Sequence, residues 1–376
     1  MKVLTLKGTS KERGSIIGET LREDIHAILE KHDDSIAKLS GYDLKNYYSA
    51  FDEYNNHYSA IKRWAPDILQ EVYSTAKAAN VDQKRFLRFQ LLDEHWGFDT
   101  FHYAPKARVL NKCSTFGVVD EGGLLPTYAG QNLDIPSYIE GHQVLLRIQY
   151  PDSDLENLVY TYSGSISLCG MNNSPLGISL NTTMQLGYRP DGLPVVFLVR
   201  KLLEMSSFDE VVQFLKTVKH ASGLTYTLSS PGRIGCFECS PNKVVEYRPK
   251  PDGLRVCHTN HPLANNDTTD FEELIKADLH SSWVKGVANS HSRLATITAR
   301  TMNREGTLKI EDLKSALRAK DDPENPVCRD MSTDINASSI AYTAGSIIYE
   351  MSNEPKFHLA AGPPSESEFI TFDFQR

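Results

Sequence analysis

Hydrophobic residues recur at helical spacing through the first hundred residues, which predicts a helical segment from residue 9 to about residue 99. Thr9-Ser10 is placed to cap a helix that continues to Leu29, and Asp82 to cap one that includes Phe89. Another amphipathic helix is expected over residues 58–79. Residues 100–111 have the composition of a connecting loop.

From residue 113 onward the pattern changes to short apolar or alternating runs separated by turn residues, as is typical of strands. The predicted strands are 113–119, 123–130, 143–149, 158–162, 176–182, 224–229, 235–239, 244–248, 255–258, 339–350, 357–361 and 369–374. Helices are expected over 193–205, 208–219, 270–302 and 311–317, with Ser206-Ser207 capping the second. This order predicts an α+β fold in which two sheets pack face to face and helices cover both outer faces.

Length and composition fit a soluble globular protein. The chain has 376 residues, is 40% hydrophobic and 23% charged, and carries a formal charge of -8. An acidic balance disfavours nucleic acid or an anionic membrane as the main partner. Residues 1–8 lack an apolar core of signal-peptide length, so a cytoplasmic location is expected.

The six cysteines show neither the spacing of a secreted disulfide framework nor that of a complete zinc site. Cys236 and Cys239 form an isolated CxxC in an apolar run, and we interpret them as buried strand cysteines. The sequence predicts no metal and no resident cofactor.

Cys113 begins a strand-like run at the change from helix to strand, and Asp134 follows about one hairpin later. If the bond between Lys112 and Cys113 were cut, Cys113 would gain a free α-amine. Such an amine titrates near ~7.7–8.0 and can act as the base for its own thiol. A buried thiol that behaves as a small hydrophobic side chain is the ordinary alternative.

A second polar group closes a later strand at His258-Thr259-Asn260-His261, before a loop that contains Pro262. Loops of this kind often carry side chains directed at a ligand. The amide of Asn260 is a candidate donor to a developing oxyanion, an interaction worth roughly 2.7–4 kcal/mol in barrier. Ser240 is either a hydrogen-bond partner or a turn former.

Taken together, the ordered motifs resemble the acyl-coenzyme A:6-aminopenicillanate (isopenicillin N) acyltransferase family, and also β-alanyl-dopamine hydrolases. The motifs are Cys113-Ser-Thr, Gly130-Gln-Asn-Leu-Asp134, Tyr188-Arg-Pro-Asp-Gly-Leu-Pro194, Phe237-Glu-Cys-Ser-Pro241, His258-Thr-Asn-His261 and Ile347-Ile-Tyr-Glu350, with Gly8–Gly14 suiting the helical segment. The resemblance implies a four-layer αββα N-terminal nucleophile hydrolase sandwich. It is preceded by a helical pro-segment (1–112) that self-cleavage separates from the catalytic domain (113–376), with the two chains remaining associated.

The resemblance also implies roles for individual residues. Cys113 would be the self-processing residue and nucleophile, Asp134 would orient its amine, Asn260 would donate to the oxyanion, Ser240 and Ser339 would assist processing or activity, and Asn181 and His258 would contact substrate. Ile340 stands where the acyltransferase has an arginine, which argues against a β-lactam substrate. The segment 91–95 departs from the family's Asn-x-Arg pattern, and Lys112 is larger than the usual residue before the cut.

We therefore predict a cysteine amidohydrolase that acts on a small-molecule amide through an acyl-enzyme. The alternatives are an acyl-CoA-dependent N-acyltransferase that takes a small acyl donor, and an uncut Cys–His hydrolase that uses Cys113 with His258 or His261. A non-catalytic binding protein with an uncut chain is the alternative from another class. A metal enzyme has little support, because no third ligand has a recognisable spacing to His258 and His261.

Overall fold

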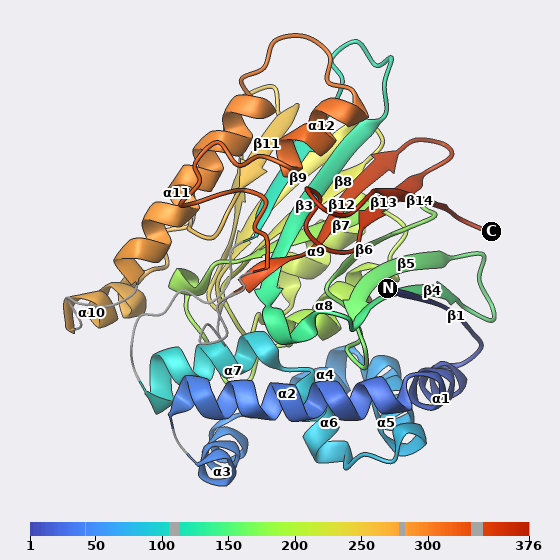
Figure 1. The fold of residues 1–376 in the computed structure, drawn as a ribbon, viewed down its shortest axis with the longest axis vertical. Coiled ribbons are helices and arrows are strands. Elements are labelled where there is room, and N and C mark those ends of the chain that lie inside the picture. Colours follow the sequence, from blue (N-terminus) through green and yellow to red (C-terminus); the bar gives the residue numbers. More distant parts are fainter. Residues whose placement is uncertain (42, 105–112, 278–282, 332–340, 376) are drawn as a thin grey trace.

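Two β-sheets packed face to face form the centre of the computed structural model, which describes residues 1–41, 43–104, 113–277, 283–331 and 341–375 (Figure 1). Within these residues one sheet has eight strands in the order β1-β4-β5-β6-β7-β8-β9-β10, and the other has six in the order β11-β2-β3-β12-β13-β14. The strands are β1 Lys2–Lys7, β2 Ser114–Val118, β3 Thr127–Pro136, β4 Gln143–Gln149, β5 Glu156–Tyr162, β6 Cys169–Asn172, β7 Leu176–Thr182, β8 Leu224–Ser230, β9 Arg233–Cys239, β10 Val244–Tyr247, β11 Arg255–His258, β12 Ala341–Met351, β13 Lys356–Ala360 and β14 Ile370–Asp373.

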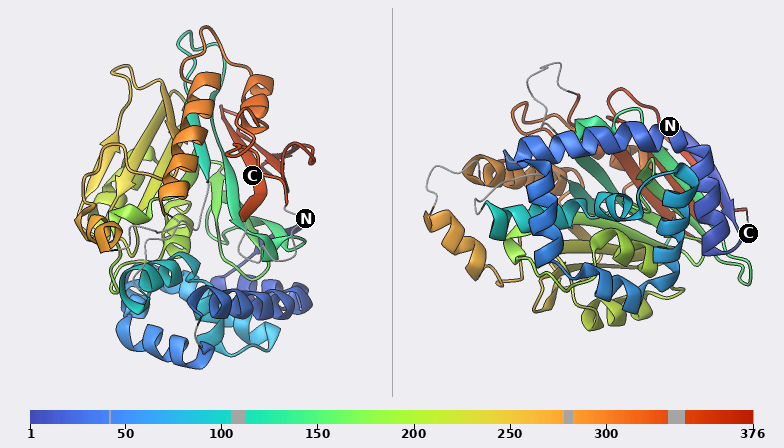
Figure 2. Two further views of the ribbon diagram at one scale, coloured as in Figure 1. Left: turned by 60° about the vertical axis from the view of Figure 1, so that its left-hand side comes forward. Right: turned by 90° about the horizontal axis from the view of Figure 1, so that it is seen from below.

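Helices lie on the outer faces of both sheets and at one end of the sandwich (Figure 1, Figure 2). They are α1 Ser10–Thr20, α2 Arg22–Ser40, α3 Leu44–Tyr54, α4 His57–Trp64, α5 Pro66–Ala79, α6 Gln83–Phe89, α7 Leu92–Phe98, α8 Val195–Leu202, α9 Phe208–Thr217, α10 Thr269–Ala277, α11 Trp283–Arg300 and α12 Ile310–Leu317, with shorter turns η1 Asp99–Tyr103, η2 Ser137–Ile139 and η3 Met184–Leu186. Helices α8 and α9 pack against the eight-stranded sheet, and α11 and α12 pack against the six-stranded sheet. The predicted αββα sandwich is thereby confirmed.

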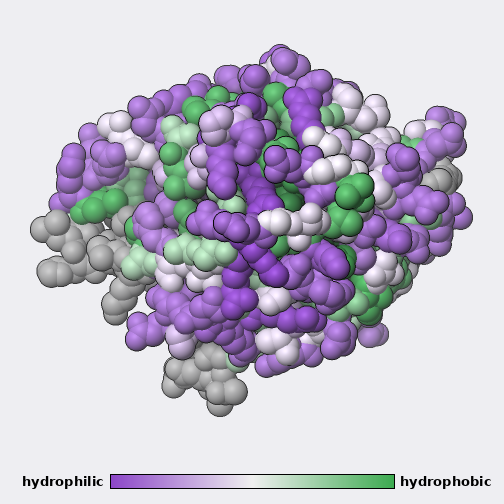
Figure 3. Space-filling view, turned by 90° about the horizontal axis from the view of Figure 1, so that it is seen from above, coloured by the Kyte–Doolittle hydropathy of each residue, from purple (hydrophilic) through white to green (hydrophobic). Residues whose placement is uncertain are grey.

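The core between the sheets is formed by apolar residues on the facing sides of both. Leu133 and Ile347 of the six-stranded sheet lie in one cluster with Leu145, Leu158 and Met171 of the eight-stranded sheet. At the end of the sandwich seen in Figure 3 the surface is mostly hydrophilic, with only small separate hydrophobic areas. No helix among the described residues combines the length and hydrophobicity needed to cross a membrane.

Most predicted elements occur, but two predicted helices are each divided. The helix expected from Ser10 to Leu29 breaks at Leu21, which is buried at the corner between α1 and α2. The helix expected over 58–79 breaks at Ala65, because Pro66 disfavours helical conformation in the residue before it and then starts α5. The block expected over 270–302 contains two helices, α10 and α11.

Strand β3 differs most from the prediction of a strand over 123–130. It begins at Thr127 and continues through Pro136, so the polar cluster at its end lies inside the strand. These polar side chains stay in the sheet because they are hydrogen-bonded: Asn132 Nδ2 donates to the carbonyl oxygens of Leu317 and Val327, at 2.8 and 2.9 Å. Strands β1 and β6 were not predicted.

The first hundred residues are built into the sandwich rather than attached beside it. Strand β1 pairs in parallel with β4, from Lys2 opposite Val144 to Lys7 opposite Gln149. Helix α1 packs directly on α5, since a Cβ atom at Gly14 would lie 2.3 Å from the carbonyl oxygen of Glu71.

A buried ion network fastens the same region to α8. Glu71 accepts from Arg13 Nε at 2.8 Å and from Arg200 Nη1 at 2.9 Å, and all three side chains are almost fully buried. Burial by itself raises the pKa of the Glu71 carboxyl, but the two guanidinium groups outweigh it and lower the pKa. One carboxylate therefore compensates two buried cations from α1 and α8.

We expect Glu71→Gln to lower the free energy of unfolding by about 3–5 kcal/mol, because it leaves two buried guanidinium groups without an anion. Urea denaturation at pH 7 measures this loss. Asp209→Asn removes a carboxylate whose ion pair with Arg233 is exposed, and it should change stability by less than about 1 kcal/mol. Equal effects of the two variants would contradict the role given to Glu71.

Candidate active site

Cys113 directly precedes β2 and lies between the two sheets, with 1% of its surface exposed. Antiparallel pairing places Ser114 opposite Asn132 of β3, so Asp134 lies alongside the cysteine at the same end of the strands. Burial, followed by the charge of Asp134, raises the pKa of the Cys113 thiol to about 12, although Arg293 and the Asp134 backbone act in the opposite direction. In the uncut chain this thiol is therefore protonated at neutral pH.

Asp134 is fully buried and accepts a hydrogen bond at 2.6 Å from the hydroxyl of Thr343 on β12. The pairing of β3 with β12 places these two residues opposite one another, at a point where the register shifts between Thr343 and Gly345. The carboxylate is thus fixed in direction by a neighbouring strand of the same sheet.

Asn260 reaches Cys113 through the guanidinium group of Arg293. Arg293 Nη2 donates to Asn260 Oδ1 at 2.9 Å, and Arg293 Nη1 donates to the carbonyl oxygen of Cys113 at 2.5 Å. The amide nitrogen of Asn260 donates to the carbonyl oxygen of Thr182 at 3.0 Å. The predicted nucleophile and the predicted oxyanion donor therefore belong to one hydrogen-bonded group.

Asn181 on β7 approaches the same place from the opposite sheet. Its Oδ1 accepts from the hydroxyl of Thr115 at 2.8 Å, two residues after the cysteine. Its buried amide nitrogen has no hydrogen-bond partner among the residues that the structure describes. Asn181 thus presents an unused donor within the region between the sheets.

His258 and Ser240 make contacts of a different kind. His258 Nε2 lies 2.8 Å from a carboxylate oxygen of Glu238, and that carboxylate accepts the backbone N–H groups of Leu263, Ala264 and Asn265. Ser240 accepts from the N–H of Lys243 at 3.0 Å and donates to Asp267, so its bonds are those of a turn. Both residues hold the loop after Asn260, and within the described part of the chain neither side chain is hydrogen-bonded to Cys113. Lys112 and Ser339 lie outside the described residues.

Residues 121–365 match the family described as acyl-coenzyme A:6-aminopenicillanic acid acyl-transferase. The chain belongs to this family. Asp134, Asn181, Ser240 and Asn260 lie within the match, whereas Cys113 precedes it. A comparison with curated protein sequences gave no match.

Solved structures with a similar fold have low sequence identity to this member of the acyltransferase family. One is the N-acylethanolamine-hydrolyzing acid amidase ortholog of Caenorhabditis elegans, with 13% identity, a TM-score of 0.42, and coverage of 70% of this chain and 100% of that chain. Another is penicillin V acylase from Agrobacterium tumefaciens, with 14% identity, a TM-score of 0.43, and coverage of 70% and 87%. These likenesses concern the fold alone.

Three charged residues that contact the predicted site residues or their hydrogen-bond partners were not predicted as part of the site. Arg293 on α11 bonds the cysteine carbonyl, Glu238 organises the loop after Asn260, and Asp93 on α7 accepts from the hydroxyl of Thr182 at 2.8 Å. Burial raises the pKa of Asp93 to about 6, and burial together with the charge of Asp93 raises the pKa of Glu94 to about 8. One indication in the sequence that Asp93 is unusual is that the segment 91–95 departs from the family's Asn-x-Arg pattern. No sequence pattern indicated that Arg293 belongs to the site.

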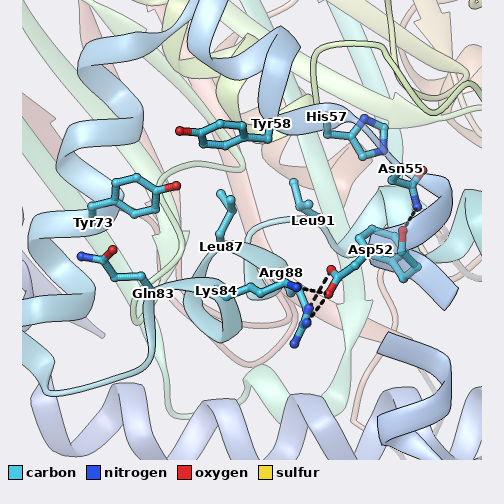
Figure 4. Close-up of a pocket in the computed structure, with 11 residues that line it drawn as sticks. Asp52, Asn55, His57, Tyr58, Tyr73, Gln83, Lys84, Leu87, Arg88 and Leu91 are labelled. Atoms are coloured by element: carbon cyan, nitrogen blue, oxygen red, sulfur yellow. Dashed lines mark hydrogen bonds and ion pairs between the residues drawn. The ribbon is translucent and has the colours of Figure 1, made fainter. Parts of the chain in front are cut away.

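A cavity of about 370 Å³ lies elsewhere, among α3, α4, α5 and α6 (Figure 4). Tyr58, Tyr73 and Leu87 line it, and at one side Arg88 is hydrogen-bonded to Asp52. None of the predicted site residues lies among those that line it. It is therefore a feature of the helical segment.

The contribution of Glu238 to stability should depend on pH. Burial alone raises the pKa of its carboxyl, but His258 and the loop N–H groups outweigh it and hold the pKa below its ordinary value. The stability that the ionised Glu238 contributes is fully present above the pKa of this carboxyl in the unfolded chain, near 4.5. It is lost as the pH falls through the lower pKa of the carboxyl in the folded protein.

We expect Glu238→Gln to destabilise the protein at pH 7 by about 1.5–3 kcal/mol, because hydrogen bonds to a charged acceptor lose their charge. Below the folded pKa the difference from wild type should shrink. Urea denaturation over a range of pH tests this, with Glu246→Gln, an exposed carboxylate on β10, as the matched control. A difference that is independent of pH would contradict the assignment.

Proposed function

We propose that the chain is the precursor of a self-processing cysteine amidohydrolase of the N-terminal nucleophile type, which acts on the amide bond of a small N-acyl compound. The observation that carries the proposal is the grouping of Cys113 with Asp134, Asn260 and Asn181 at one end of β2 and β3. Membership of the acyltransferase family supports acyl chemistry for this group.

Maturation is a displacement at the Lys112 carbonyl carbon. The Cys113 sulfur bonds to this carbon, the carbon–nitrogen bond breaks, and the nitrogen takes the thiol proton to become the α-amine of Cys113. Water then cleaves the thioester, which leaves Lys112 as a carboxylate and restores the thiol. The reaction consumes one water molecule and needs no cofactor.

The cut also creates the base that the mature enzyme needs. In the uncut chain the thiol is protonated, because burial raises its pKa to about 12. The new α-amine titrates near ~7.7–8.0 and is neutral in a useful fraction near pH 8, so it can accept the thiol proton. Asp134 lies close enough to orient the amine and to balance its charge when it is protonated.

Two side-chain amides are available to bind the oxyanion of the tetrahedral intermediate. An amide nitrogen carries two N–H groups, of which Asn260 directs one to Thr182. The amide nitrogen of Asn181 is buried and has no partner within the described part of the chain. In this proposal, both amides form hydrogen bonds to the negative oxygen as it develops.

Acyl transfer is the second candidate function, favoured by the description of the family. The acyl-enzyme is common to both reactions, and they differ in whether water or an amine accepts the acyl group. We favour hydrolysis because Ile340 replaces the arginine that the acyltransferase motif places after Ser339. A cytoplasmic location belongs to the proposal, and the six buried cysteines without disulfides fit a reducing compartment.

The two chains of the mature protein are proposed to stay together without a covalent bond. Strand β1 remains paired with β4, and Glu71 remains bound to Arg200 after a cut at residue 112. Co-elution of both fragments at neutral pH, and their separation in denaturant, is the expected behaviour.

Self-cleavage is tested by the intact mass of freshly purified protein under denaturing conditions. We expect two fragments that meet at Lys112 and Cys113 in wild type, and a single uncut chain in Cys113→Ala. Cys169→Ala, which alters another buried cysteine, should be cut like wild type. A wild-type chain that stays whole on long incubation, with no hydrolysis of N-acyl compounds, would instead favour a binding protein.

The role of Asn260 is tested by the kinetics of the cut enzyme on a panel of N-acyl amines, with and without an added amine acceptor. Asn260→Ala should lower kcat about 10²–10³-fold, because one oxyanion donor is lost. Asn303→Ala, which alters an exposed asparagine, should leave kcat unchanged. A kcat for Asn260→Ala within threefold of wild type would remove Asn260 from the mechanism, and acylated acceptor as the main product would favour acyl transfer.

A further inference from the structure

Arg293 is a buried cation, and within the described part of the chain its hydrogen bonds go to neutral acceptors. Its side chain is 1% exposed, and these bonds reach Asn289 Oδ1, the Cys113 carbonyl oxygen, Ser114 Oγ and Asn260 Oδ1 at 2.9, 2.5, 2.9 and 2.9 Å. Burial lowers the pKa of the guanidinium to about 10, so it remains charged at neutral pH.

This arrangement is costly for a residue that only fills space. Removing an ion from water costs several kcal/mol, and an apolar side chain of similar volume avoids that cost. The charges that favour the cation are those of Asp134 on β3 and of an ionised Cys113 just before β2, while Arg329 acts against it. The charge of Asp93 on α7 disfavours the thiolate. The positive charge of Arg293, which is hydrogen-bonded to the Cys113 carbonyl oxygen, is therefore close enough to favour an ionised Cys113 thiol.

The guanidinium also fixes the orientation of Asn260. Arginine has donors and no acceptor, so it accepts only the oxygen end of the asparagine amide as its neighbour. The NH₂ end is then turned away toward Thr182, where it donates at 3.0 Å. Rotating the amide by half a turn would place donor against donor and would leave the Thr182 carbonyl without this bond.

The same group holds the cysteine after a cut. Cleavage would make Cys113 a chain terminus, and chain termini fray unless they are held in place. Arg293 Nη1 binds both the Cys113 carbonyl oxygen and the Ser114 hydroxyl, so the residue stays held from its C-terminal side. A nucleophile displaced by 1 Å can lose about 10²-fold in rate.

We infer that Arg293 is the positioning residue of this centre. Its guanidinium group anchors the carbonyl of Cys113, orients the side-chain amide of Asn260 and places a positive charge beside the thiolate. The inference rests on the proposed function and adds to it a residue from α11, outside every sequence motif described above.

The test compares Arg293→Met, Arg293→Lys and the matched control Arg300→Met. Arg300 lies two turns further along the same helix and pairs with Asp321 at the surface. For each variant we would measure the rate of self-cleavage, and kcat of the cut enzyme from pH 5 to pH 10.

Arg293→Met should reduce both rates about 10²-fold and move the rising limb of the pH profile to higher pH. Loss of the positive charge favours both the neutral thiol and the protonated amine, so the two effects have the same sign. Arg293→Lys should show the rising limb of the pH profile at its wild-type position but should recover only part of the wild-type rate. Arg300→Met should behave as wild type.

Three results would overturn the inference. The first is an Arg293→Met variant with wild-type rates and an unshifted pH profile. The second is an equal loss of rate in Arg293→Met and Arg293→Lys with no shift of the pH profile, as a purely structural role would give. If Arg293→Met does not fold, the inference is tested with Arg293→Lys and with Asn289→Ala, which removes the acceptor of Arg293 Nε and keeps the positive charge. The third contradicting result would be wild-type rates in both of these variants.

Failure of the proposed function gives a different pattern. A wild-type chain that is neither cut nor active removes the proposed function and this inference together. A wild-type chain that is cut, with Arg293 variants cut equally well, removes only the inference.

Discussion

Cys113 lies directly before β2 among buried polar groups that are hydrogen-bonded to other elements, apart from the amide nitrogen of Asn181, which has no partner within the described residues. Unpaired polar groups there would each cost about 1–3 kcal/mol, so their partners constrain several elements at once. Asp134 is held by Thr343 of β12, Asn181 by Thr115 of β2, and Asn260 by Arg293 of α11. These hydrogen bonds fix strands of both sheets and the covering helix α11 relative to one another around the cysteine.

The helical segment takes part in this network instead of merely covering it. Its first strand completes the edge of the eight-stranded sheet beside β4, and Glu71 compensates buried cations on both sides of the proposed cut. Asp93 of α7 accepts from Thr182, whose carbonyl oxygen accepts from Asn260. The helical segment thus stabilises the fold, and through Asp93 it also contacts Thr182, the hydrogen-bond partner of the predicted oxyanion donor Asn260.

Sequence was sufficient for the architecture because its signal is local. The alternation in 143–149 and 176–182 predicted β4 and β7 with the correct bounds, and Asp82 and Ser207 cap α6 and α9 as expected. It failed where burial changes the meaning of a polar residue, as in β3, whose Asn132 and Asp134 suggest a turn and yet lie inside a strand. Arg293 gave no signal, since an arginine in an amphipathic helix usually faces solvent and only the fold brings it to Cys113. Cys113, Asp134 and Asn260 were predicted from motifs, and their proximity is what the structure adds.

Charge balance explains why the uncut chain and the proposed mature enzyme need the same surroundings. With the thiol protonated, the negative charge of Asp134 partly compensates the positive charge of Arg293. Ionising the thiol adds one negative charge, and the α-amine that takes the proton adds one positive charge at the same residue. The net charge of the buried group is therefore unchanged by the proton transfer that activates the nucleophile. A site of this kind can remain dry throughout the reaction, which favours capture of the acyl-enzyme by a bound acceptor or by a single admitted water molecule.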